Sequence, residues 1–167
     1  MSISFTDKLA ARIEKTGSAL CVGLDPRPVM DDLQAVPVLL RKVVEETAPY
    51  AAAFKPNIAY FEAMGLRGLE MLEELLPDMP DDVPVVLDVK RGDIGETQKY
   101  YAQAYFERLG VDAVTLSPFM GYRFCHSFQS RPALFPANMR AWPSHEGVSG
   151  TGHRTQYAPS PQFSGLS

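Results

Sequence analysis

Four short apolar segments recur along the chain about every 30 residues, and each of the first three is followed by a stretch with helical spacing. Alternation at this spacing is typical of βα units. Strands that are apolar almost throughout indicate a parallel sheet covered by helices. The sequence therefore predicts an α/β fold with about four parallel strands, over Ser18–Pro26, Tyr50–Asn57, Asp82–Gly92 and Val111–Pro118.

Helical spacing of apolar residues fills the intervals between these segments. A helix is expected from residue 5 until Gly17 stops it, and the next is expected from about Pro37 to residue 49. Two further helices are expected over residues 58–77 and 93–110. The chain of 167 residues is long enough for one domain with a core of its own.

Composition excludes several classes of protein. The net charge of −4 gives no support to nucleic-acid binding, and no apolar run approaches the ~20 residues of a membrane helix. No basic region followed by an apolar one marks a secretory signal, so we expect a cytoplasmic protein. Cys21 and Cys125 do not make a disulfide framework, and Cys21, in an apolar run, is predicted to be a buried structural thiol.

Charged residues stand at the ends of the predicted strands, where parallel α/β folds place their chemistry. Asp88 and Lys90 are two residues apart on a strand, so their side chains point to the same face. Lys55 ends the preceding strand and is expected beside them, and Asp93 follows in the next loop. Alternating lysines and aspartates would give each buried charge a partner.

Structural interpretations of the same residues stay open. Asp93 and Glu96 have the spacing of a capping box, so Asp93 is also a candidate helix cap. Asp25 precedes a proline and suits a turn, and Lys55 suits a surface lysine with a buried stem. Asp88 and Lys90 also suit a simple salt bridge. No metal-ligand spacing is found among His126, His145 and His153.

The block "LDVKRGDI", with its Asp-x-Lys-x-x-Asp pattern, resembles the orotidine 5′-phosphate decarboxylase family. Three other blocks resemble strands of the longer bacterial branch of that family in the same order: "LCVGLDPRP", "FKPNIAYFEAMG" and "VTLSPFMGY". The resemblance covers roughly residues 5 to 122. It implies a (β/α)8 TIM barrel that works as a homodimer, of which this sequence supplies the N-terminal half, since a full barrel takes about 250 residues.

The resemblance also implies an activity and residue roles. The family converts orotidine 5′-phosphate to UMP and CO2 in pyrimidine biosynthesis without a cofactor. By resemblance, Lys90 is the proton donor and Asp88 lies near the substrate carboxylate. Lys55 binds a ribose hydroxyl and links the aspartates, and Asp25 contacts the ribose or a neighbouring charge. Asp93, Ile94 and Thr97 correspond to residues that reach into the partner's site. Related decarboxylases that use Mg²⁺ carry an acidic ligand where this chain has Lys55, so no metal is expected.

After Gly121 the sequence changes character. Residues 122–167 contain one acidic residue, Glu146, and no lysine, and they show no helical or strand period. We therefore divide the chain into residues 1–121, the half-barrel, and residues 122–167, an irregular tail that is either disordered or read out of frame; we favour the frame change. No counterpart of the family's C-terminal phosphate-binding loops is found. An inactive fragment of the enzyme and another phosphosugar-binding βα protein therefore remain alternative functions.

Overall fold

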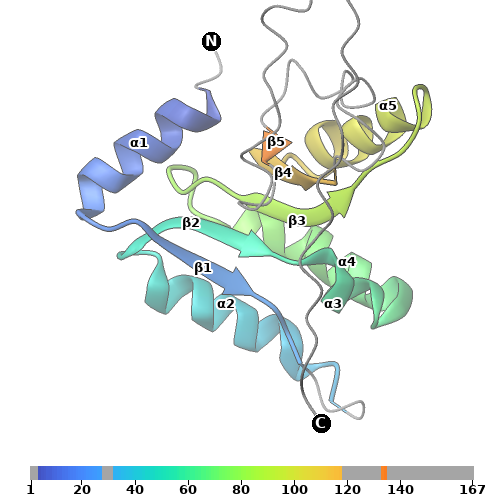
Figure 1. Ribbon diagram of the computed structural model, residues 1–167. Coiled ribbons are helices and arrows are strands. Elements are labelled where there is room, and N and C mark those ends of the chain that lie inside the picture. Colours follow the sequence, from blue (N-terminus) through green and yellow to red (C-terminus); the bar gives the residue numbers. More distant parts are fainter. Residues whose placement is uncertain (1–3, 28–31, 118–132, 135–167) are drawn as a thin grey trace, which may run out of the picture.

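The computed structural model describes residues 4–27, 32–117 and 133–134 (Figure 1). Every strand predicted from the sequence is present, which confirms the α/β class. In chain order the elements are α1 (Phe5–Thr16), β1 (Leu20–Leu24), α2 (Ala35–Thr47), β2 (Ala51–Pro56), α3 (Ile58–Glu62), α4 (Gly65–Leu75), the 3-10 turn η1 (Leu76–Asp78), β3 (Val86–Arg91), α5 (Thr97–Ala102), the π-helix η2 (Gln103–Arg108), β4 (Ala113–Leu116) and β5 (Ala133–Leu134).

The strands run parallel and follow one another in space in their chain order (Figure 1). β1 pairs with β2, and β3 pairs with β4. The pair β1–β2 joins the other strands between β2 and β3. There the Phe54 amide donates to the Pro84 carbonyl oxygen at 3.0 Å, and Asn57 and Asp88 form an isolated parallel β-bridge. All carboxyl ends of the strands therefore lie at one edge, as βα units require.

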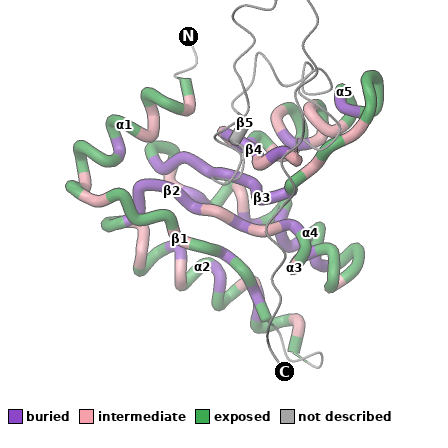
Figure 2. The backbone as a smooth tube through the Cα atoms, viewed as in Figure 1, coloured by how far each residue is buried: buried purple, intermediate pink, exposed green. Residues whose placement is uncertain are grey.

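A single apolar cluster joins the strands to the helices that cover them. Burial is deepest in β2, β3 and β4, which are mostly purple in Figure 2. Each main strand contributes to the cluster, and α2 and α4 add residues from their apolar faces: Leu24, Leu40, Phe54, Leu72, Leu87 and Val114. Burial of these side chains stabilises the layered arrangement.

β1 is more exposed than the sequence predicted. Only Leu24 of this strand is buried, and Leu20 is 48% exposed. Cys21 is exposed, so its prediction as a buried structural thiol is wrong. The reason is position: within the described residues β1 has a paired neighbour, β2, on one edge only.

Two helices differ from their expected extent. α2 begins at Ala35 rather than near Pro37, because the carboxylate of Asp32 accepts a hydrogen bond from the Ala35 amide at 3.2 Å. A proline is tolerated in the first turn, where no intrahelical donor is needed. The stretch 58–77 is interrupted by Gly65, whose φ of 69° is left-handed, and this change of direction separates α3 from α4.

The third crossover helix begins four residues later than the sequence suggested. α5 starts at Thr97 with Glu96 as its N-cap, so Asp93 is not the helix cap that the capping-box pattern offered. The carboxylate of Asp93 instead accepts from the adjacent Ile94 amide at 2.7 Å. Gly110, with a φ of 68°, follows the helical segment as expected.

β5 lies in the segment 122–167, for which the sequence predicted no regular element. Ala133 and Leu134 pair in parallel with Val114 and Thr115 of β4. The frame change and the disorder considered for the rest of this segment fall outside the described residues.

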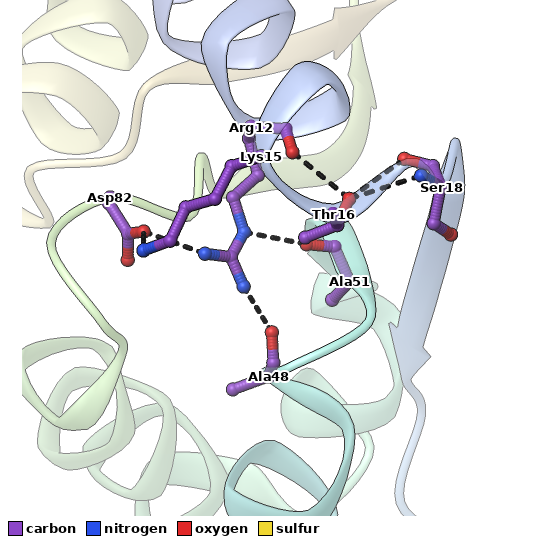
Figure 3. A network of polar contacts seen from close by, with 7 residues as sticks. All are labelled: Arg12, Lys15, Thr16, Ser18, Ala48, Ala51 and Asp82. Carbon is purple, nitrogen blue, oxygen red and sulfur yellow. Dashed lines mark hydrogen bonds and ion pairs between the residues drawn. The ribbon is translucent and has the colours of Figure 1, made fainter.

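The amino-terminal ends of the strands are held by α1 (Figure 3). Arg12 is 6% exposed, and its guanidinium donates to the carbonyl oxygens of Ala48 and Ala51 and to the carboxylate of Asp82. Lys8 forms an ion pair with Asp112 at 2.9 Å, and Asp112 also accepts from the Val85 amide. These contacts are structural and lie at the end of the sheet opposite the strand ends where chemistry was predicted.

Candidate functional site

The carboxylate of Asp88 is the centre of a charged cluster at the carboxyl end of the sheet. One of its oxygens accepts from the Lys90 ammonium at 2.5 Å and from the Thr115 hydroxyl at 2.7 Å. The other accepts from the Lys55 ammonium at 3.1 Å. The side chain of Asp88 is 9% exposed, whereas those of Lys55 and Lys90 are 34% and 55% exposed. The buried anion is thus fully partnered, and both cations remain accessible to a ligand.

Adjacent strands bring these residues together. Lys55 precedes the last residue of β2, Asp88 and Lys90 belong to β3, and Thr115 belongs to β4. Parallel neighbours with their carboxyl ends aligned place these side chains on one rim. The predicted grouping of Lys55, Asp88 and Lys90 is found in the structure, and the Lys90 ammonium points toward Asp88.

The partners of Asp88 keep it ionised. Burial acts to raise the pKa of Asp88, but hydrogen bonds from Lys90, Thr115 and Lys55 outweigh burial and lower the pKa below its ordinary value. A carboxylate held in this state stays negative throughout the neutral range and orients both ammonium groups.

The lowered pKa of Asp88 predicts a pH-dependent stability. Ionised Asp88 stabilises the folded chain above the unfolded pKa of about 3.9, and that contribution is lost as pH falls through the lower folded pKa. We expect Asp88→Asn to cost about 2 kcal/mol at neutral pH and the difference from wild type to shrink below about pH 4. Urea denaturation of both proteins from pH 7 to pH 3 measures this. The exposed Asp81→Asn is the control, and a wild-type advantage that grew with acidity would contradict the prediction.

Lys90 has an unusual backbone conformation. Its φ of 44° is left-handed, which is uncommon for a residue other than glycine and costs energy. The next residue, Arg91, is anchored on the other side: its guanidinium donates to the Tyr105 hydroxyl at 3.0 Å and to the Glu62 carboxylate at 2.5 Å. It also lies over the ring of Tyr101. The end of β3 is therefore tied to α3, α5 and η2.

The other predicted site residues do not join this cluster. Asp25 is exposed just after β1 and, in the described part of the chain, makes no ion pair with Lys55. Asp93 and Ile94 lie in the loop before α5, and Thr97 begins that helix. Gln98, 1% exposed, holds this loop by donating to the Asp93 carbonyl oxygen at 2.6 Å. The role of Asp93, Ile94 and Thr97 at a partner's site stays a prediction.

Two residues of the site carried no signal in the sequence. Thr115 looked like an ordinary β-branched strand residue, and Arg91 looked like a charge at the end of a strand. Their partners are 27 and 29 residues away in the chain, at Asp88 and Glu62. The strand order could have suggested Thr115, because residues at the same level of adjacent parallel strands meet at the rim, whereas the partner of Arg91 lies on helix α3.

Neither a metal site nor a membrane span is found in the part of the chain that the structure describes. No group of three or more histidine, cysteine, aspartate or glutamate side chains there is arranged to hold a metal ion. No helix among the same residues is sufficiently long and apolar to cross a bilayer.

The chain is similar to known decarboxylases. The sequence model of the "Orotidine 5'-phosphate decarboxylase / HUMPS family" matches residues 18–131, and so extends past Gly121. The orotidine 5′-phosphate decarboxylase of Verminephrobacter eiseniae is 48% identical over 127 residues, which cover 72% of this chain and 46% of that protein. The enzyme of Herpetosiphon aurantiacus is 40% identical over 133 residues, covering 76% and 50%.

A solved structure agrees with these relatives. The Leishmania donovani OMP decarboxylase superposes with a TM-score of 0.73 and 40% identity, over 80% of this chain and 53% of that one. The fold is thus part of a TIM barrel, and the chain spans about half the length of the curated relatives it matches. With its parallel βα units, its lysine–aspartate cluster and the match over residues 18–131, the chain belongs to the orotidine 5′-phosphate decarboxylase / HUMPS family.

Proposed function

We propose that the Lys55–Asp88–Lys90 cluster serves the decarboxylation of orotidine 5′-phosphate to UMP and CO2. The observation that carries this proposal is the contact of two ammonium groups with one buried, ionised carboxylate at the carboxyl end of parallel strands. The relatives named as orotidine 5′-phosphate decarboxylases support the same reaction.

The reaction breaks the bond between C6 of the pyrimidine ring and its carboxyl carbon. CO2 leaves, and the electron pair stays on C6. The Lys90 ammonium, 2.5 Å from Asp88, then offsets the developing negative charge and donates a proton to C6 as general acid. No electron sink from a cofactor enters this scheme.

Asp88 and Lys55 have supporting roles in the scheme. Asp88 lies near the carboxylate of the bound substrate and orients Lys90 through their ion pair. Lys55, held by the other oxygen of Asp88, presents donors to the ribose hydroxyls, and Asp25 contacts the ribose. The alternation of charges keeps each group in one orientation.

We also propose a homodimer in which Asp93, Ile94 and Thr97 contact the partner's site. The 56% exposure of Ile94, an apolar side chain in the loop next to the cluster, supports this role. Sedimentation of the purified chain as a monomer at all concentrations would contradict it. The cytoplasmic location stays a prediction.

The function is tested by incubating the purified chain with orotidine 5′-phosphate. The loss of orotate-ring absorbance and the release of CO2 are followed, together with binding of UMP by calorimetry. Decarboxylation supports the proposal. Binding without CO2 release indicates a phosphosugar-binding protein, and a folded chain without either indicates an inactive fragment.

A further inference from the structure

We propose that Thr115 is a positioning residue of this site: its hydroxyl holds the Asp88 carboxylate and the backbone of Lys90 in the arrangement that presents the Lys90 ammonium. The inference rests on the function proposed above, but the contacts that carry it are hydrogen bonds within this chain and involve no ligand. Thr115 lies on β4, the strand next to β3 (Figure 1).

The hydroxyl of Thr115 uses its whole hydrogen-bonding capacity within this site. It donates to the Asp88 carboxylate at 2.7 Å. It accepts from the Val89 amide at 3.0 Å and from the Lys90 amide at 2.9 Å. A hydroxyl offers one donor and two acceptor sites, so all three are occupied.

These bonds occur where the ladder between β3 and β4 is interrupted. Leu87 pairs with Val114, but the next pair joins Arg91 to Leu116, so residues 88–90 of β3 face Thr115 alone. At this interruption the amides of Val89 and Lys90 find the Thr115 side chain as their acceptor. The amide of Val89, a buried residue, needs such a partner, and the amide of the exposed Lys90 shares the same acceptor.

The interruption coincides with the left-handed φ of 44° at Lys90. A residue persists in this conformation only where its surroundings hold it. Thr115 accepts a hydrogen bond from the Lys90 amide. The next residue, Arg91, is held by Glu62 and Tyr105. The same hydroxyl also restricts the Asp88 rotamer, because it binds the oxygen that receives Lys90.

The chemistry predicts which side chains can replace threonine. Serine keeps the hydroxyl and should keep the three bonds. Valine keeps the shape but offers no hydrogen bond, so the two amides and one carboxylate oxygen each lose a partner. Because Thr115 is only half-buried, the fold should tolerate either replacement.

Thr115→Ser and Thr115→Val are therefore the matched pair for the test. Amide hydrogen exchange at Val89 and Lys90 should be slow in wild type and in Thr115→Ser and at least about tenfold faster in Thr115→Val. Exchange at Leu87 should not change. In a carbon-13 titration, the midpoint of Asp88 should rise in Thr115→Val but not in Thr115→Ser.

The activity measurement is separate from these readouts. Thr115→Val should lower kcat by about tenfold or more with little change in KM, and Thr115→Ser should remain close to wild type. If wild type does not decarboxylate the substrate, the proposed function fails, whereas amide exchange and titration still decide the role of Thr115.

The inference is overturned if Thr115→Val leaves exchange at Val89 and Lys90 unchanged. It is also overturned if exchange accelerates equally along β3 and β4, which would indicate a purely structural role. Should Thr115→Val fail to fold, wild type decides: slow exchange at both amides supports the inference, and fast exchange at both overturns it.

Discussion

On the proposed function, replacing Lys90 with alanine is expected to lower the rate of decarboxylation by at least about 10³-fold, because the site would lose the proposed general acid and one of its two cations. Lys90 forms the shortest contact to Asp88, at 2.5 Å, and its side chain remains 55% exposed for a ligand. The remaining cation, Lys55, contacts the other oxygen of Asp88 and stands on another strand. It is therefore not placed to deliver the proton in place of Lys90.

The measurement is the steady-state rate of orotate-ring absorbance loss in both proteins. Lys42→Ala, which removes an exposed lysine of α2 that pairs with Glu46, should leave the rate unchanged. Because Asp88 keeps Lys55 and Thr115 as partners, Lys90→Ala should still melt cooperatively. A folded Lys90→Ala variant with more than a tenth of the wild-type rate would refute the assignment.

The largest effect on stability is expected at the opposite end of the sheet, at Arg12. Its guanidinium binds two main-chain carbonyl oxygens and the Asp82 carboxylate, and the residue is 6% exposed (Figure 3). Arg12→Met keeps the apolar stem but removes the guanidinium that donates to the Ala48 and Ala51 carbonyl oxygens, and it leaves Asp82 paired with the exposed Lys15. We expect a loss of about 3 kcal/mol in the free energy of unfolding.

Lys15 offers a matched control, since it pairs with the same carboxylate oxygen of Asp82. The Lys15 side chain is 66% exposed, so its ion pair contributes little to stability. Lys15→Met should lower the free energy of unfolding by about 0.5 kcal/mol or less. Urea denaturation followed by circular dichroism compares the two variants. Equal losses in Arg12→Met and Lys15→Met would show that burial and the carbonyl contacts do not matter.

The predictable part of the fold was the part with local signals. Apolar strands spaced about 30 residues apart and the stop at Gly17 come from residues close together in the chain, so the sequence indicated them correctly. The break at Gly65 and the late start of α5 at Thr97 were missed. In both cases helical spacing continues through the residues concerned, and backbone direction decided the boundary.

Exposure was harder to predict than strand position. Cys21 lies in an apolar run, which favours burial, yet β1 stands at the edge of the described sheet. Whether an apolar strand is covered depends on its neighbours in space and not on its own composition.

The sequence by itself determined that the chain forms parallel βα units with Lys55, Asp88 and Lys90 at the strand ends, because periodicity and strand alternation are properties of neighbouring residues. Only the tertiary structure decided that Thr115 holds that cluster, that Arg91 anchors the end of β3 and that Arg12 holds the opposite end of the sheet. Their partners come from other strands and helices, and such contacts exist only once the chain has packed them side by side.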